Sequence, residues 1–282
     1  MATKIIIDSA SDINKFEAES MGITLIPLTI TFGTEEFKDG VELMPREFFE
    51  KLVESDELPK TSQITAYDFE EVYKSVVKNG DEAVVITISS RLSGTNGSAN
   101  IAAENYKDKI FVVDSMSATI GERLLCRLAM RLIKQGLSAK QIKDELDLAK
   151  NKLNVMGVLE TLEYLKKGGR ISSAVAFVGG VLSIKPVVKI VDGEVKMVGK
   201  AMGSKKGNNL LNTMVQQCGG INFDLPFGVT WSGFDDTVMK KYIHDSAHLW
   251  QEHVDSVPTY PLGATIGTHV GPGVVAVAFF EN

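Results

Sequence analysis

The chain has 282 residues and a mass of 30.7 kDa, close to the size at which one hydrophobic core stops growing and a second domain forms. Hydrophobic residues make up 44% of it and charged residues 23%, a globular composition that argues against a disordered or fibrous protein. The net charge of −6 argues against a strongly basic, nucleic-acid-binding protein. We therefore expect a globular protein with no nucleic acid partner.

The first half of the chain alternates between strand and helix patterns. We predict strands over 4–8, 24–32, 83–89 and 110–114, and helices over 45–54, 67–77, 96–106, 117–135 and 138–151. Ser138 and Gln141 have the spacing of a capping box at the start of the last of these helices. Such alternation favours a mainly parallel sheet with helices on both faces.

The pattern changes near residue 152. We predict strands over 155–159, 228–232 and 274–280, helices over 160–167, 206–217 and 235–252, and a hairpin over 186–198. Asp192 and Gly193 form the hairpin turn, because both positions of such a turn need a positive φ. The predicted fold is therefore α/β, with an N-terminal α/β domain over 1–152, a smaller C-terminal α+β domain over 153–282, and a ligand between them.

Three features of the chain favour a cytoplasmic protein. Asp8 interrupts the first apolar run too early for a signal peptide. The longest uncharged stretch, 256–280, contains three prolines and four glycines, which favours a loop and a buried strand over a membrane span. Cys126 and Cys218 lie far apart with no CxxC motif, so we expect two small apolar side chains in a reducing compartment.

The segment 89–99 (SSRLSGTNGSA) is the most informative candidate for a ligand site. It follows a predicted buried strand and leads into a helix, so it lies at the carboxyl edge of the sheet, where open α/β folds bind ligands. Its hydroxyls, Gly94 and the free N–H groups of the helix start can hold an anion without a charged side chain. The alternative is a helix cap with no ligand.

Two further polar clusters are expected near strand ends. In the segment 60–65, Thr65 and Asp68 are spaced as a helix cap, which leaves the hydroxyls of Thr61 and Ser62 free to donate. The cluster 8–12 (DSASD) has a sufficient structural explanation as a cap for the helix that follows.

The histidines predict no metal site. His269 stands in a glycine-rich segment, 266–273, which we expect to be a loop whose backbone can approach a ligand closely. His244, His248 and His253 fall on one predicted helix, and no third ligand accompanies the i,i+4 pair. The chain also lacks a Walker A loop, a G-x-G-x-x-G after a strand and a G-x-S-x-G elbow, so nothing indicates a nucleotide cofactor or a dedicated catalyst.

Charge is concentrated in one segment, 166–206. It carries nine basic residues against Asp192 and Glu194, a net charge of +7 in a chain of net charge −6. The segment is either a solvated hairpin face or a docking surface for an acidic partner or an anionic membrane.

Five short motifs occur in order along the chain: DSxSD (8–12), TSQ (61–63), SSxLSGTxxSA (89–99), LEYLKKGGRIS (162–172) and IGTHVGPG (266–273). Each is weak by itself. Together they resemble the DegV family, whose members are also called fatty acid-binding subunits of bacterial fatty acid kinase. The resemblance covers almost the whole chain.

The resemblance implies a two-domain α/β protein that holds one long-chain fatty acid between its domains, with no cofactor and no metal, and that is not an enzyme by itself. A kinase subunit related to dihydroxyacetone kinases would use ATP to convert the bound carboxylate to an acyl phosphate. By position, the residues carried over to the carboxylate are Thr61, Ser93, Gly94 and His269. The residues carried over to the head group or the kinase are Arg170, Ser62 and Thr95.

The hydrocarbon chain needs only an apolar tunnel, and its candidate walls are 174–184 and 120–132, which can equally be ordinary core. Two other functions stay open. A hydrolase would use Ser93 as nucleophile and His269 as base, with Asp8 or Asp114 as the orienting carboxylate. An interaction protein would hold the lipid as a structural part only.

Overall fold

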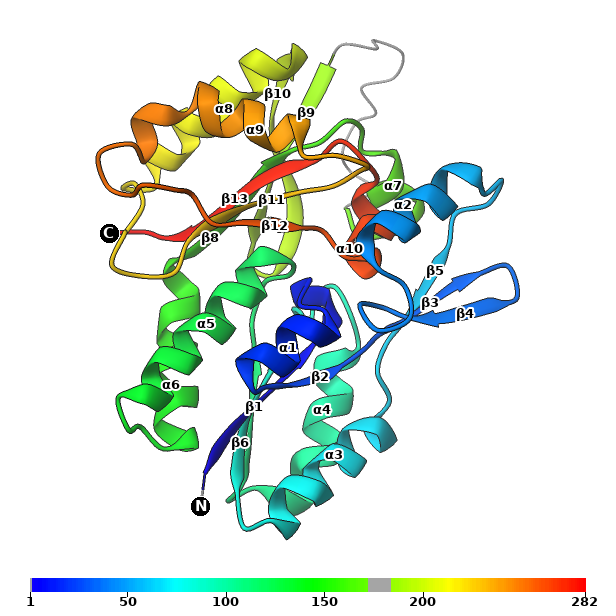
Figure 1. The fold of residues 1–282 in the computed structure, drawn as a ribbon, viewed down its shortest axis with the longest axis vertical. Helices are drawn as coiled ribbons and strands as arrows, with labels where there is room; N and C mark the ends of the chain where they lie inside the picture. Colours follow the sequence, from blue (N-terminus) through cyan, green and yellow to red (C-terminus); the bar gives the residue numbers. More distant parts are fainter. Residues whose placement is uncertain (1, 172–183) are drawn as a thin grey trace.

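Three β-sheets with helices packed around them make up the fold (Figure 1). The computed structural model describes residues 2–171 and 184–282. In Figure 1 the six-stranded sheet and its helices form the upper layer of the molecule, and the four-stranded sheet and its helices form the lower layer. The small three-stranded sheet projects to one side.

The first sheet is parallel and contains four strands in the order β2-β1-β6-β7. Its strands are β1 (Thr3–Asp8), β2 (Thr24–Ile26), β6 (Glu82–Thr87) and β7 (Ile110–Asp114). The helices α3 (Ala66–Lys78) and α4 (Thr95–Ala103) pack on one face, and α5 (Ile120–Lys134) and α6 (Ala139–Ala149) on the other. This arrangement confirms the predicted parallel sheet with helices on both faces.

The second sheet is small and antiparallel, in the order β4-β3-β5, and the sequence did not predict it. Its strands are β3 (Thr29–Phe32), β4 (Glu35–Lys38) and β5 (Lys60–Ser62), and the helices nearby in sequence are α1 (Lys15–Met21) and α2 (Pro45–Glu54). The single strand predicted over 24–32 is wrong, because the chain passes from β2 to β3 at Pro27 and changes sheets there. Proline has no N–H for a ladder, so it ends the pairing of β2.

The third sheet is mixed and contains six strands in the order β10-β9-β8-β13-β11-β12. These are β8 (Leu153–Val158), β9 (Ile184–Val191), β10 (Glu194–Met202), β11 (Gly228–Trp231), β12 (Thr259–Pro261) and β13 (Val275–Phe280). The predicted hairpin is confirmed: β9 and β10 pair antiparallel, and Asp192 and Gly193 have φ values of 52° and 79°. The helices α8 (Gly203–Gln217) and α9 (Thr237–Asp245) cover the outer face of this sheet (Figure 1).

Helix α5 connects the parallel sheet to the six-stranded sheet. Its buried leucines pack in one cluster with Ile7 and Ile86 of the parallel sheet and with Val155 and Phe280 of the six-stranded sheet. The carboxyl ends of β1 and β6 consequently point toward the six-stranded sheet (Figure 1). The predicted division at residues 152 and 153 falls just before β8 and stays a prediction.

Helix α10 (Ala264–Val270) replaces the glycine-rich loop that the sequence predicts around His269. The helix packs on α2, in a cluster that also holds Ala264, Phe48 and Phe49. A Cβ on Gly267 would lie 2.5 Å from Cε1 of Phe48, so a glycine is needed there for close packing of two helices. The loop prediction is wrong because it interpreted this glycine as backbone freedom.

Two smaller predictions have opposite outcomes. The helix cap at Thr65 with Asp68 in the first turn and the capping box at Ser138 and Gln141 are confirmed. The helix predicted over 235–252 is wrong beyond α9, because Ser246 is buried and its hydroxyl donates to Asn212 Oδ1 at 2.8 Å, where the chain turns. Helix α7 (Glu163–Lys167) and four short 3-10 turns complete the described elements. No helix within 2–171 and 184–282 combines the length and the apolar composition needed to span a bilayer.

Candidate functional site

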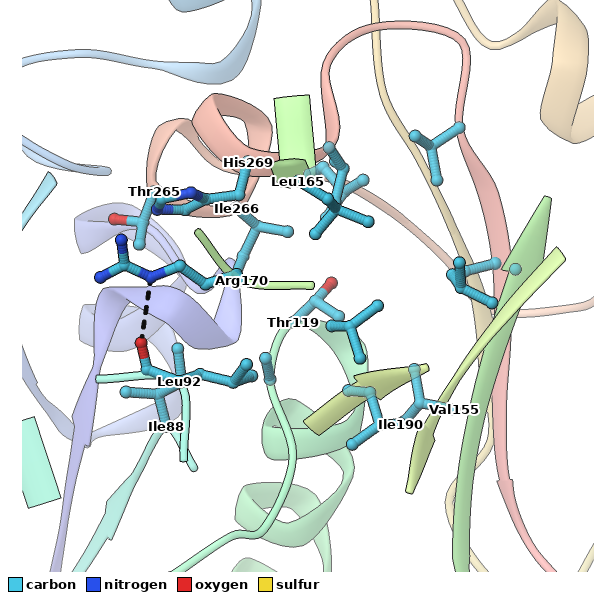
Figure 2. A pocket seen from close by; sticks show the side chains of 18 of the residues that line it. Ile88, Leu92, Thr119, Val155, Leu165, Arg170, Ile190, Thr265, Ile266 and His269 are labelled. Carbon is cyan, nitrogen blue, oxygen red and sulfur yellow. Dashed lines mark hydrogen bonds between the residues drawn. The ribbon is translucent and has the colours of Figure 1, made fainter. Parts of the chain in front are cut away.

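A cavity of about 220 Å³ lies between the carboxyl edge of the parallel sheet and the six-stranded sheet (Figure 2). Segments far apart in sequence line it: β5, the loop after β6, the segment after α7, the β9–β10 hairpin, α10 and β13. Figure 2 shows His269, Arg170 and Leu92 at one end of the cavity, and Val155 and Ile190 at the other. The first end is polar and the second is apolar.

Strand β5 sets which side chains of the TSQ motif reach the polar end. Thr61 and Gln63 line the cavity, whereas Ser62 between them is exposed and does not line it, as the two-residue period of an extended chain requires. Thr61 Oγ1 lies 3.0 Å from Nε2 of His269, in a hydrogen bond that joins β5 to α10. The family resemblance implies that Ser62 lies near the head group or the kinase, but Ser62 does not line the cavity in the described structure.

The loop between β6 and α4 contributes Ser93 and Gly94. Thr95 does not line the cavity; it is buried behind Ser93, with the two hydroxyl oxygens 2.9 Å apart, and its N–H donates to Ser93 Oγ at 3.2 Å. These contacts orient the Ser93 hydroxyl. Thr95 is therefore a support for the site residue and not a wall of the site.

Gln63 is a cavity residue that the sequence analysis did not single out. A Cβ on Gly94 would lie 2.0 Å from Gln63 Oε1, so the glycine lets the amide approach the loop closely. The amide nitrogen of Gln63 donates to Ser98 Oγ at 3.1 Å. The signal was present in the TSQ motif, because Gln63 lies two residues after Thr61 and shares its face of the strand.

His269 is a neutral imidazole in this site. Burial and the Arg170 guanidinium lower its pKa from the ordinary value of 6.5 to about 4. Its Nδ1 is buried and has no hydrogen-bond partner among the described residues, and a Cβ on Gly168 would lie 2.2 Å from that nitrogen. Gly168 therefore makes room for the ring.

Arg170 is the only formally charged side chain among the described residues that line the cavity. Its Nε donates to the carbonyl of Leu92 at 3.3 Å, drawn as a dashed line in Figure 2, and its Nη1 donates to the carbonyl of Gly168 at 2.6 Å. Arg170 thus bridges the segment after α7 and the loop that carries Ser93. A single cation at the polar end favours an anionic ligand group there.

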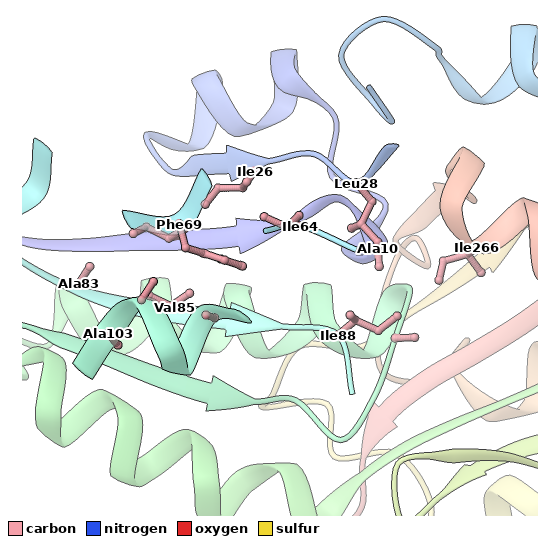
Figure 3. Close-up of a cluster of buried hydrophobic side chains, with 14 of the residues drawn as sticks. Ala10, Ile26, Leu28, Ile64, Phe69, Ala83, Val85, Ile88, Ala103 and Ile266 are labelled. Carbon is pink, nitrogen blue, oxygen red and sulfur yellow. The ribbon is translucent and has the colours of Figure 1, made fainter. Parts of the chain in front are cut away.

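The apolar end is lined by side chains of the six-stranded sheet and by the core of the N-terminal half. Val188, Ile190 and Val195 come from the hairpin. Leu28, Ile88 and Ile266 belong at once to the cavity wall and to the buried cluster of Figure 3, which continues as far as Phe69 of α3. The cavity is therefore continuous with the hydrophobic core.

The two tunnel walls predicted from sequence have different outcomes. The segment 120–132 lies in α5 and packs in the core, and the cavity is lined by Ala118 and Thr119 just before it, so of the two alternatives left open for this segment ordinary core is the one observed. Apolar content alone did not distinguish a core helix from a ligand wall. The segment 174–184 falls outside the described residues except for Ile184.

The described residues do not form the triad that a hydrolase needs. Asp8 accepts hydrogen bonds from the N–H groups of Ala10 and Ile88, at 2.9 and 2.8 Å. Asp114 accepts from the N–H groups of Ser90 and Met116, at 3.2 and 2.9 Å. Both carboxylates are thus engaged with backbone, and His269 lacks the orienting partner of a catalytic base.

The remaining histidines form no metal site in the described part of the chain, which contains no group of three or more metal-ligating side chains. His244 is exposed on α9, and His253 stacks on Phe223 with ring centroids 4.2 Å apart.

A family model described as "Uncharacterised protein, DegV family" matches residues 2–282. The chain belongs to the DegV family. A DegV domain-containing protein of Deinococcus radiodurans is 32% identical over 282 residues, which cover 99% of this chain and 98% of the relative. The family assignment that the five motifs indicated is therefore confirmed.

Solved structures of DegV proteins have the same fold. A Thermus thermophilus DegV family protein, described by its fatty acid binding, superposes with a TM-score of 0.89 at 29% identity and full coverage of both chains. A stearic acid-binding protein of Eubacterium ventriosum superposes with a TM-score of 0.85 at 27% identity, over 100% of this chain and 98% of that chain. The α/β fold with a parallel sheet and a mixed sheet is thus shared with these proteins.

The DegV motif at 8–12 lies behind the cavity in a cluster of buried acids. Burial raises the pKa of Asp8 and of Asp12 from 3.8 to about 7. Burial and the charges of these two neighbours raise the pKa of Glu122 well above its ordinary value. The helix cap predicted for this motif is present, because the Asp8 side chain caps the 3-10 turn Ser9–Ser11.

Proposed function

We propose that this DegV protein binds one long-chain fatty acid, with the carboxylate at the polar end of the cavity and the hydrocarbon chain in the apolar end. The observation that carries the proposal is the convergence of Thr61, Ser93 and His269 from three distant segments on one end of a cavity that is lined mostly by apolar side chains. The fatty acid binding described for solved DegV relatives supports it.

The polar end suits a carboxylate that must stay reachable. Hydroxyl and N–H groups of Ser93, Gly94 and Thr61 hold the anion without a bidentate arginine, and a neutral His269 contributes a donor without forming an ion pair. Among the described residues that line the cavity, Arg170 supplies the one positive charge, while its Nε and Nη1 are engaged with backbone carbonyls. The head group is thus stabilised but not enclosed by charge.

The apolar end provides most of the affinity. Each buried CH₂ group contributes about 0.8 kcal/mol, so a sixteen-carbon chain gains roughly 10 kcal/mol before the costs of ordering are subtracted. We expect no further cofactor and no metal.

We further propose that the protein acts in the cytoplasm, not as an enzyme by itself, and presents the carboxylate to an ATP-dependent kinase subunit related to dihydroxyacetone kinases. The basic segment supports a docking surface near the head group. Ile171, next to Arg170, forms a bridge with Val195 of β10, so the segment after α7, with its two lysines Lys166 and Lys167, meets the basic hairpin strand at a residue that lines the cavity. Transient contact with an anionic membrane, where the fatty acid is exchanged, fits the same surface.

Mass spectrometry of lipid extracted from the purified protein tests the binding proposal. We expect free long-chain fatty acid at about one molecule per chain, and much less from a Thr61→Val/Ser93→Ala double variant. A wild-type protein that carries no lipid and binds none when offered palmitic acid contradicts the proposal. The hydrolase alternative predicts instead a burst of product from an acyl ester, which the double variant abolishes.

Charge reversal tests the docking surface. Lys166→Glu, Lys167→Glu and Lys205→Glu together should weaken acyl phosphate formation by the kinase while fatty acid binding stays unchanged, because all three lysines are exposed and none lines the cavity. Unchanged coupling at physiological salt removes the docking role from this surface. Lys140→Glu on α6, also exposed, is a matched control.

A further inference from the structure

Helix α10 begins without a capping side chain of its own. Its N-cap residue is Gly263, and the first N–H groups of a helix have no partner within the helix. Two carboxylates from the first forty residues serve them. Asp39 Oδ1 accepts the N–H of Ala264 at 3.0 Å, and Asp12 Oδ1 accepts the N–H of Gly263 at 2.8 Å.

The contacts of Asp39 with α10 go beyond one backbone bond. Its Oδ2 accepts the N–H of Thr265 at 3.2 Å and the hydroxyl of Thr265 at 2.6 Å. Asp39 is only 1% exposed, and its own N–H donates to the carbonyl of Leu28 at 3.0 Å. Both Thr265 and Leu28 line the cavity, so Asp39 connects two of its walls.

Asp12 makes a second connection of the same kind. Its Oδ2 accepts the hydroxyl of Thr119 at 2.5 Å, and Thr119 lines the cavity with a positive φ of 54°. A β-branched residue rarely adopts that backbone conformation, so the surrounding contacts must hold it. Asp12 thus joins the start of α10 to a strained residue in the opposite wall.

Asp12 and Asp39 are both buried carboxylates. Removing a carboxylate from water costs several kcal/mol, which the hydrogen bonds it accepts must offset. The backbone N–H groups that these two carboxylates accept belong to residues 263–265, at the start of α10. The desolvation cost of these two carboxylates is explained if the function requires α10 to be held in one position.

The place of α10 decides where His269 lies. His269 is five residues after Ala264 on the same short helix, so a shift of the helix start moves the imidazole by a similar amount. The bond between His269 Nε2 and Thr61 Oγ1 is 3.0 Å long, and a displacement of about 1 Å removes such a bond.

We propose that Asp39 and Asp12 are positioning residues for the carboxylate site: by holding the N-terminus of α10, they place His269 against Thr61 and so determine the preference of the cavity for an acid head group. This inference rests on the proposed fatty acid binding.

The test compares Asp39→Ala with Glu82→Ala. Glu82 is also buried, and it accepts the N–H of Ala139 at 2.8 Å, at the start of α6 and at the end of β6 away from the cavity. The two variants therefore each remove a buried carboxylate from the start of a helix. The affinities of palmitic acid and of 1-hexadecanol are measured for each at pH 8, above the raised pKa of Asp12.

We expect Asp39→Ala to reduce the preference for the acid over the alcohol by about tenfold, mainly through weaker acid binding. Glu82→Ala should lose thermal stability and keep the wild-type preference. A preference unchanged in Asp39→Ala, or an equal loss of acid and alcohol binding, overturns the positioning role. A wild-type protein that shows no preference for the acid overturns the proposed function instead.

A milder variant keeps the test valid if Asp39→Ala does not fold. Asp39→Asn preserves the volume of the side chain but replaces one carboxylate oxygen by an NH₂ donor, so it loses either the acceptor for Ala264 or the acceptor for Thr265. It should show a smaller loss of the same preference. A folded Asp39→Asn with the full wild-type preference contradicts the inference in the same way.

Discussion

The two ends of the cavity are built by different physical means. The polar end depends on single hydrogen bonds, such as those joining Thr61 to His269 and Thr95 to Ser93, each of which fixes one atom. The apolar end depends on the sum of many weak contacts with residues such as Val188 and Ile190, none of which has a unique partner. The polar end should therefore respond to small displacements, and the apolar end to changes of volume.

The largest expected effect comes from filling the apolar end. Ala276 lines the cavity in β13, opposite Gly157 of β8. We expect Ala276→Phe to lower the affinity for a sixteen-carbon acid about a hundredfold, because losing room for about four CH₂ groups costs about 3 kcal/mol. A competition assay with acids of ten and sixteen carbons checks this. The shorter acid should be affected much less, and equal losses for both lengths contradict a purely steric end.

The second effect concerns the hydroxyl of Thr61. Thr61→Val keeps the shape of the side chain and removes the hydroxyl, so acid affinity should fall about tenfold while alcohol affinity changes little. Ser62→Ala is the matched control, because Ser62 is the next residue of β5 and is exposed. Isothermal titration with both ligands measures the difference. A similar loss of acid affinity in both variants contradicts the proposal that Thr61 contacts the carboxylate and Ser62 does not.

The third effect tests the close approach of Gln63 to the Ser93 loop. Gly94→Ala should weaken acid binding several-fold, since its Cβ would overlap Gln63 Oε1 and displace the loop. Gly97→Ala is the control: it lies in α4 with no atom within 4 Å of its Cβ, so it should raise stability by about 1 kcal/mol. Chemical denaturation and a binding assay separate the two outcomes, and full binding by Gly94→Ala removes the steric role of this glycine.

The smallest effect is a pH dependence from His269. The unfolded chain takes up a proton here near pH 6.5 and the folded chain only near pH 4, so protonation favours unfolding as the pH falls through that range. His269→Gln has no imidazole at this position and therefore takes up no such proton on unfolding. The stability of the wild type relative to His269→Gln should therefore decline between pH 7 and pH 4.5, as measured by urea unfolding. If the difference in unfolding free energy between the wild type and His269→Gln stays constant over this pH range, His269 is not a neutral, buried imidazole.

Local patterns were sufficient to predict the parallel sheet, the β9–β10 hairpin and the capping boxes. In each case the residues of a short segment determine its local structure, as Asp192-Gly193 determines the hairpin turn through the positive φ of both residues. The residues around the polar end were also predicted from motifs, and Thr61, Ser93, Gly94, His269 and Arg170 line one cavity. Their role toward a carboxylate stays a prediction.

What the sequence could not predict depends on contacts between distant segments. The small sheet arises because β3 pairs with β5, some thirty residues later, across a helix. Helix α10 forms in a glycine-rich segment because Asp12, Asp39 and the aromatic rings of α2 stabilise it from outside. The strand that pairs with β3 and the side chains that stabilise α10 are both distant in the sequence, so the local pattern of residues does not reveal them.

Strand β13 has a consequence for the order of assembly. It lies between β8 and β11 in the six-stranded sheet, yet it follows every other strand of that sheet in the sequence. The strands β8 and β11 therefore cannot be joined into one sheet until residues 275–280, which pair with both of them, have left the ribosome. A nascent chain that has exposed only residues 2–270 would contain Thr61, Ser93 and His269 but would lack the strand that joins β8 to β11 in the sheet that lines their cavity.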